Sequence, residues 1–257
     1  MFKLSSIEFG KLFHLTSLRF SLIALILFPI LWAYAPGIFQ VYGFFIVSGY
    51  QVPALSLLSS MEFLLPLIIA VASAELLGLE LAHGTLPTVL LRPVTRSQWL
   101  LAKILVAILY PFALLAFLFV VSLVTGVFYG YGSFAGGTGV GAGGLLGQGI
   151  LSAGGALAEL GRAYMMAAVS LIPISLLSIL FTVIFMNAAG GALATLALLI
   201  SMKLLIVFPG LEPYLLTTQL NAYVAPIGNL GITFALIALY AAIFAASSVI
   251  LFERKDF

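Results

Sequence analysis

The sequence predicts an all-α integral-membrane protein, and three observations indicate this class. Of the 257 residues, 63% are hydrophobic and only 7% are charged, whereas a soluble domain carries roughly 25% charged residues. The sequence has no Asp, Glu, Lys or Arg at 20–61, 104–158, 163–202 or 213–252. These apolar blocks are continuous, which is typical of spanning helices and not of alternating barrel strands. The composition excludes a soluble enzyme, a nucleic-acid-binding domain, a coiled coil and a disordered chain.

Residues 2–19 are expected to form an amphipathic helix that lies in the membrane interface. At 100° per residue, Phe2, Phe9, Phe13 and Phe20 fall within about 40° of one another, and charged residues occupy most of the opposite half. Such a helix lies among the headgroups with its apolar face in the acyl region. The alternative is a simple basic flank to the first span.

Six membrane-spanning helices are expected after this segment. A span needs about 20 mostly apolar residues. With Pro and Gly as punctuation, the spans fall near 20–36, 57–78, 100–126, 162–186, 190–208 and 229–251. An even number of spans puts both termini on one side. If that side is cytoplasmic, eight of the ten Lys and Arg residues lie inside, as the positive-inside rule requires.

Two outer segments are expected between the spans. Residues 127–161 form a glycine-rich loop, because 14 of the 25 glycines lie at 126–161 and glycine loses the most entropy on ordering. Residues 209–228 form a re-entrant or interfacial hairpin. Prolines and glycines interrupt this hairpin at both ends, and its apolar stretch at 214–224 is too short to cross a bilayer.

The most informative segment is 79–98, on the inner side between the second and third spans. We expect a helix that stops at Gly84, a short amphipathic piece, a turn at Arg92-Pro93, and a cap for the third span at Thr95 or Ser97. A cytoplasmic helix of this kind, with charges at both ends, suits docking to a soluble partner.

This segment resembles the ABC-2 type ABC transporter permeases. The residues that match the family pattern are Glu80, Gly84, Thr85, Leu86, Leu90, Arg92, Pro93, Val94, Arg96 and Lys103. The six-span plan, the N-terminal interfacial helix and the broken outer segment also fit that family. The glycine-rich outer loop is a departure from it.

The resemblance implies a permease subunit, in an exporter of the prokaryotic plasma membrane, with cytoplasmic termini. The segment 79–98 is then the coupling helix that contacts a separate ATP-binding cassette subunit. The sequence has no Gly-x-x-x-x-Gly-Lys-Ser/Thr loop, so ATP and Mg are expected on that partner and no cofactor or catalytic residue on this chain. Family architecture implies two copies of this permease, or one copy with a related permease, together with two ATPase chains.

The contact residues that the resemblance implies are Glu80, His83, Gly84, Thr85, Leu86, Arg92, Pro93 and Arg96. Glu80 is either a polar contact or an anchor for the coupling helix, against the alternative of a solvated charge. The two arginines either pair with acidic partner residues or supply positive charge and headgroup contacts. Lys203 either lines a pathway or extends its ammonium outward from the span. No metal site is expected.

Two other functions compete with this one. A secondary transporter or channel usually needs several ionisable groups at mid-membrane, and the spans here are almost free of charge. A membrane enzyme needs clustered His, Asp or Glu, and the chain has only two histidines and one aspartate. The substrate is not encoded in any motif.

Overall fold

The computed structural model of the chain describes residues 8–11, 16–34, 46–82, 95–135, 145, 150–208, 210–224 and 230–255. Six of its helices are long and apolar enough to cross a membrane, which confirms the predicted fold class at this level. These helices are α2 (Thr16–Tyr34), α5 (Leu64–Ala82), α7 (Arg96–Gly126), α8 (Ala153–Phe185), α9 (Ala188–Leu204) and α11 (Leu230–Glu253). The shorter elements are α4 (Gln51–Glu62), η1 (Val127–Tyr129), β1 (Phe134–Ala135), β2 (Ile150–Leu151), η2 (Leu205–Val207), η3 (Glu212–Tyr214), α10 (Leu216–Gln219) and η4 (Leu220–Tyr223).

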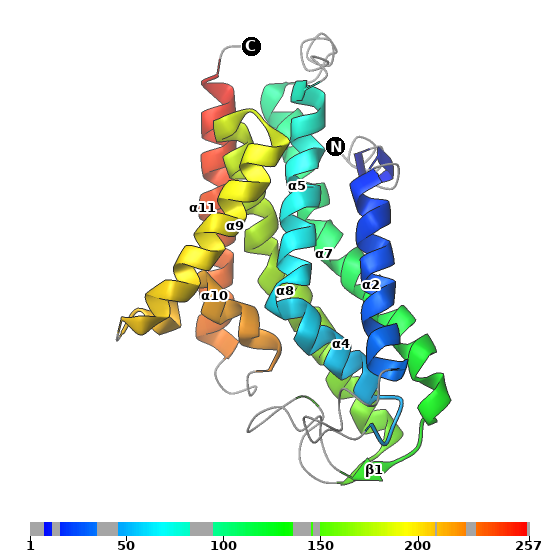
Figure 1. The fold of residues 1–257 in the computed structure, drawn as a ribbon. Helices are drawn as coiled ribbons and strands as arrows, with labels where there is room; N and C mark the ends of the chain where they lie inside the picture. Colours follow the sequence, from blue (N-terminus) through cyan, green and yellow to red (C-terminus); the bar gives the residue numbers. More distant parts are fainter. Residues whose placement is uncertain are drawn as a thin grey trace.

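Helix α8 is the centre of the bundle. It contacts α5, α7, α9 and α11, and most of its side chains are buried. By contrast, α2, α9 and α11 bury few of their side chains, and several of their large apolar side chains are exposed. Both ends of the described chain lie at one end of the bundle, where α5 ends and α7 begins (Figure 1). We call this the terminal end, and the opposite one the far end.

The expected second span, 57–78, is divided in the structure. Helix α4 ends at Glu62, Phe63 leaves helical geometry with φ −147° and ψ −43°, and α5 begins at Leu64. The cause is Pro66, which has no N–H to offer the carbonyl of Glu62 and whose ring collides with that carbonyl in a continuous helix. The Glu62 carbonyl instead accepts a hydrogen bond from Lys203 Nζ at 3.2 Å.

The glycine-rich loop is shorter than expected, because α8 begins at Ala153 rather than near 162. The hydroxyl of Ser152 accepts a hydrogen bond from the Gly155 N–H at 3.2 Å and caps the helix. Within the part of 127–161 that is described, β1 and β2 pair antiparallel, with Phe134 opposite Leu151. The cap of the third span is Thr95, one of the two residues expected there; it forms a capping box with Gln98.

The interfacial helix and the outer hairpin lie partly outside the described residues. Residues 8–11 are helical, but α2 begins at Thr16, so residues 16–19 belong to the first span and not to an in-plane helix that ends at 19. Residues 210–224 form the short turns η3, α10 and η4 at the far end, and η4 packs on α8.

Helices α5 and α9 cross in close contact at Gly78. A Cβ atom at this position would lie 2.4 Å from the Cβ of Ala188 and 2.6 Å from its backbone nitrogen, well inside van der Waals contact. Ala188 is the first residue of α9 and follows Asn187, whose side chain caps that helix. The absence of a side chain at Gly78 therefore sets how near the start of α9 lies to α5.

Gly78→Ala is expected to destabilise the fold by about 1–3 kcal/mol, because the added methyl group overpacks a backbone contact. The matched control is Gly161→Ala in α8, where a Cβ meets nothing within 4 Å. There the substitution gains about 0.5–1 kcal/mol from the lower backbone entropy of alanine. Thermal unfolding in detergent measures both, and equal effects at the two positions would contradict the close-packing argument.

Candidate coupling site

Four charged side chains gather at the terminal end of the bundle. Glu8 and Lys11 come from the helical turn at residues 8–11, Glu80 from the last turns of α5, and Lys103 from the second turn of α7. We call these four residues the charge cluster. It joins three segments that are far apart in the sequence.

Lys103 is the centre of the charge cluster. Its side chain is only 1% exposed, and its ammonium lies 2.8 Å from Glu8 Oε2 and 3.1 Å from Glu80 Oε1. The same ammonium donates to the carbonyl of Leu76 in α5 and lies 4.7 Å from the centre of the Trp99 ring. These hydrogen bonds and opposite charges compensate the ammonium for the water that it loses on burial, as the burial of a charge requires.

Lys11 closes the charge cluster on its outer side. Its ammonium lies 2.5 Å from Glu8 Oε1 and 2.9 Å from Glu80 Oε1, and its side chain is 52% exposed. Two carboxylates therefore face two ammonium groups, and the formal charge of the cluster is zero.

The ionisation of Glu8 and Lys11 is shifted in opposite directions. Burial pushes the pKa of Glu8 upward, but the neighbouring ammonium groups of Lys103 and Lys11 outweigh it and hold that pKa below its ordinary value. Burial pushes the pKa of Lys11 downward, but its hydrogen bonds to Glu8 and Glu80 outweigh it and raise that pKa. Both shifts favour the charged forms.

A second set of contacts ties the chain's C-terminal residues to the start of α7. Arg96 donates to the carbonyl of Lys255 at 2.9 Å, and the hydroxyl of Ser97 donates to Glu253. The ammonium of Lys255 donates to the carbonyls of Val183 and Ile184 at the end of α8. Trp99 stacks on Phe252 with ring centres 5.3 Å apart. The ends of α8 and α11 and the start of α7 are thus joined by side chains.

The predicted site residues are divided between the described and the undescribed parts of the chain. Glu80 and Arg96 lie at the terminal end, and both make contacts within the chain. The remaining predicted contact residues, His83, Gly84, Thr85, Leu86, Arg92 and Pro93, lie outside the described residues.

Lys203 lies at the far end, away from the charge cluster. Its ammonium is 3.2 Å from Glu62 Oε1, and both side chains are well exposed. The partner of Lys203 in the structure is therefore Glu62, the last residue of α4.

Sequence reasoning did not select Glu8, Lys11 or Lys103 as site residues. Glu8 and Lys11 are three residues apart on the polar half of a helix, which predicts their mutual pairing but not their distant partner. Lys103 belongs to the family pattern, but its burial is visible only in the structure. Among the described residues, no group of three His, Asp or Glu side chains is placed to hold a metal ion.

Six apolar helices and a neutral charge cluster at one end indicate an integral-membrane protein of the all-α class. Residues 22–257 match the family described as Protein of unknown function (DUF2705), and the chain belongs to that family. No curated protein matches the sequence. Glu8 and Lys11 precede the matched region, whereas Glu80 and Lys103 lie inside it.

Lys103→Met is expected to destabilise the fold by about 3 kcal/mol, because it leaves two buried carboxylates with one half-exposed ammonium. Lys203→Met, which removes an exposed pair, is expected to cost less than about 1 kcal/mol. Adding Glu8→Gln to Lys103→Met should restore part of the loss, because it removes the unpaired charge. Denaturant unfolding in detergent measures all three, and equal losses for Lys103→Met and Lys203→Met would refute the central role of Lys103.

The stability contribution of Glu8 is expected to depend on pH. Because its folded pKa is lowered, the contribution is fully present above its ordinary pKa of 4.5 and is lost as the pH falls through the folded pKa. The groups that face Glu8 are Lys11 from its own turn and Lys103 from α7. The stability difference between wild type and Glu8→Gln should therefore be largest near pH 7 and shrink on acidification below pH 4.5. A difference that is constant over this range would contradict the assignment.

Proposed function

We propose that this chain is the permease subunit of an ABC-2 type transporter, acting as an exporter together with a second permease copy. A separate ATP-binding cassette subunit, in two copies, binds ATP and Mg and docks on the region 79–98. The resemblance of this region to the family and the six apolar helices support the proposal.

The observation that carries the proposal is the contact of Lys103 with Glu80. The segment 83–94 leaves the end of α5 and returns at the start of α7, and this ion pair joins the two helices on either side of it. A push on the segment from a docked subunit therefore acts on α5 and α7 together. The N-terminal turn moves with them, because its Glu8 binds Lys103 and its Lys11 binds Glu80.

Glu80 acts in this proposal as an anchor rather than as a direct contact to the ATPase. Its Oε1 atom accepts from both Lys11 and Lys103, and its side chain is 14% exposed. Arg96 has a parallel role, because it holds the start of α7 to Lys255, two residues after α11 ends. Residues 83–94, between these anchors, supply the docking surface.

The distribution of positive charge supports cytoplasmic termini, whereas the prokaryotic plasma membrane location rests on the family resemblance alone. Of the described basic residues, only Arg162 and Lys203 lie toward the far end. Those that lie toward the terminal end are Lys11, Arg19, Arg96, Lys103, Arg254 and Lys255. The terminal end is therefore the cytoplasmic one under the positive-inside rule.

The depth of the charge cluster argues against an ATP-independent transporter or channel. Lys103 is seven residues from the start of α7, about 10 Å along a helix. Secondary transporters bind ions and substrates near the bilayer midplane, at broken helices. The four groups of the charge cluster lie together at the terminal end and neutralise one another, which suits a mechanical link.

The test is ATP hydrolysis by the complex isolated with a tagged form of this chain from its native membrane. Under the proposal, a chain with a Gly-x-x-x-x-Gly-Lys-Ser/Thr motif co-purifies, and the permease in lipid vesicles stimulates its ATPase activity. Glu80→Ala and Arg96→Ala should each reduce this stimulation severalfold without loss of membrane insertion. The matched control is Glu62→Ala, which removes a carboxylate from the exposed far-end pair and should leave the stimulation unchanged.

Two results would contradict the proposal. One is wild-type stimulation in both the Glu80→Ala and Arg96→Ala proteins. The other is transport by the isolated chain down an ion gradient with no ATPase present, which would favour the secondary transporter.

A further inference from the structure

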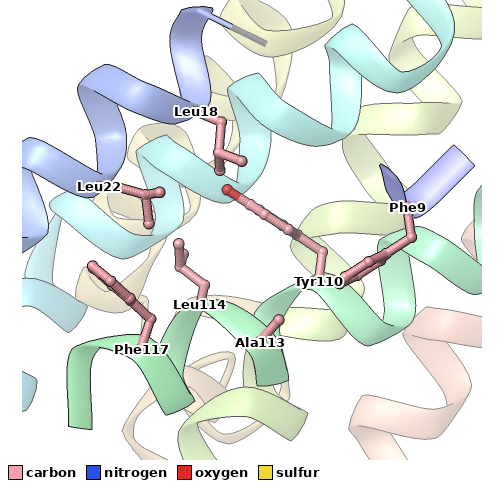
Figure 2. Close-up of a pocket in the computed structure, with 7 residues that line it drawn as sticks. All are labelled: Phe9, Leu18, Leu22, Tyr110, Ala113, Leu114 and Phe117. Atoms are coloured by element: carbon pink, nitrogen blue, oxygen red, sulfur yellow. The ribbon is translucent and has the colours of Figure 1, made fainter. Parts of the chain in front are cut away.

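A cavity of about 190 Å³ lies between the N-terminal turn, α2 and α7. Figure 2 shows the side chains that line it: Phe9, Leu18, Leu22, Tyr110, Ala113, Leu114 and Phe117. Leu18, Tyr110 and Leu114 are buried, whereas the other four are half-buried. The cavity therefore has a buried floor and an edge at the surface between α2 and α7.

Among the described residues that line the cavity, only Tyr110 supplies a polar side-chain group, its hydroxyl. Tyr110 is 3% exposed, and its hydroxyl has no hydrogen-bond partner among the described residues. Figure 2 shows it directed across the cavity toward Leu18 of α2. The nearby Glu75 carboxylate accepts a hydrogen bond from Ser17 instead. A buried hydroxyl without a partner is destabilising, so a ligand that accepts a hydrogen bond from Tyr110 would be favoured here.

Water is a poor occupant of this cavity. A buried water molecule typically makes two to four hydrogen bonds, and the lining residues that the structure describes offer one polar side chain. An apolar cavity of about 150 Å³ accommodates benzene, so this one takes a hydrocarbon segment of about six carbon atoms. The chemistry that fits is an apolar chain with a single acceptor at one end.

The position of the cavity matches the ester region of a lipid leaflet. Tyr110 follows Lys103 by seven residues, which is about 10 Å deeper along α7. If the charge cluster lies among the headgroups, Tyr110 is where the polar region of a bilayer, about 5–8 Å thick on each side, meets the hydrocarbon. Arg19, next to Leu18, is exposed and makes no ion pair within the described part of the chain, which leaves it available to an anionic phosphate.

We propose that this cavity binds one acyl chain of a membrane phospholipid, with the Tyr110 hydroxyl donating a hydrogen bond to the acyl ester carbonyl. Phe9 covers one side of the cavity and is held there by the ion pair of its neighbour Glu8 with Lys103. The bound lipid thus packs between the N-terminal turn and α7. The inference concerns a lipid site and does not depend on the proposed transport function.

The test compares two photoreactive phospholipids in phosphatidylcholine and phosphatidylglycerol vesicles that contain the full-length protein. One probe is a diacyl lipid with a diazirine on the acyl chain, and the other is its dialkyl ether analogue, which lacks the carbonyl. Mass spectrometry of peptides measures labelling at residues 110–117. Wild type should label about five-fold more with the ester probe than with the ether probe, the ratio that one hydrogen bond of about 1 kcal/mol supplies.

Three variants separate the hydrogen bond from the cavity itself. Tyr110→Phe should abolish the preference for the ester probe and bring the ratio of ester to ether labelling to about one. Ala113→Phe fills the cavity and should reduce labelling by both probes. The matched control is Ala116→Phe, an exposed position on the same helix, which should change neither.

Two outcomes would overturn the proposal. The first is an ester-to-ether ratio that is the same in wild type and Tyr110→Phe. The second is labelling that Ala113→Phe and Ala116→Phe change equally. If Ala113→Phe does not fold, the comparison of the two probes on Tyr110→Phe still decides the question. Tyr164→Phe, which removes a buried hydroxyl bonded to the Pro53 carbonyl elsewhere, controls for general loss of stability.

Discussion

The burial of one ammonium group constrains the terminal end of this protein. A charge that leaves water must be paired and hydrogen-bonded, or its burial costs several kcal/mol. Lys103 meets this requirement only because Glu8, Glu80 and a carbonyl of α5 converge on it. The N-terminal turn and the facing ends of α5 and α7 are therefore held together around a single atom. The position of Phe9, and with it one side of the lipid-sized cavity, follows from the same contact.

Unpaired backbone groups explain the other main irregularities of the fold. Pro66 leaves the Glu62 carbonyl without its helical donor, and Lys203 supplies one from α9. At the terminal end, Lys255 donates to two of the last carbonyls of α8. In both places a lysine from another part of the chain donates a hydrogen bond to a carbonyl at the end of a helix. Polar side chains thus join helices at the two ends of the bundle, and apolar contacts hold its middle. The close crossing at Gly78 joins the last turns of α5 to the start of α9 at the terminal end.

These contacts define which helices the proposed coupling region would move. The segment 83–94 connects two helices that are fixed to each other by Glu80 and Lys103 and to the C-terminal residues through Arg96. A docked partner would therefore act on a unit that includes α5, α7 and the ends of α8 and α11. The proposed lipid site lies against the same unit, because most of its lining residues belong to α7. A bound lipid would stabilise the packed position of the N-terminal turn, because a ligand stabilises the state that binds it.

The sequence by itself determined the fold class and the six apolar helices, and it narrowed the cap of the third span to Thr95 or Ser97, because hydropathy and capping are local properties that neighbouring residues settle. It also singled out Glu80 and Arg96, although not the partners that hold them. Only the tertiary structure decided that Lys103 is buried between Glu8 and Glu80, that α8 begins at Ala153 and that Tyr110 faces an apolar cavity. The two carboxylates and the ammonium are separated by tens of residues, and no periodicity relates them. Burial and pairing arise when helices meet, so they depend on the arrangement of the whole bundle rather than on any one segment.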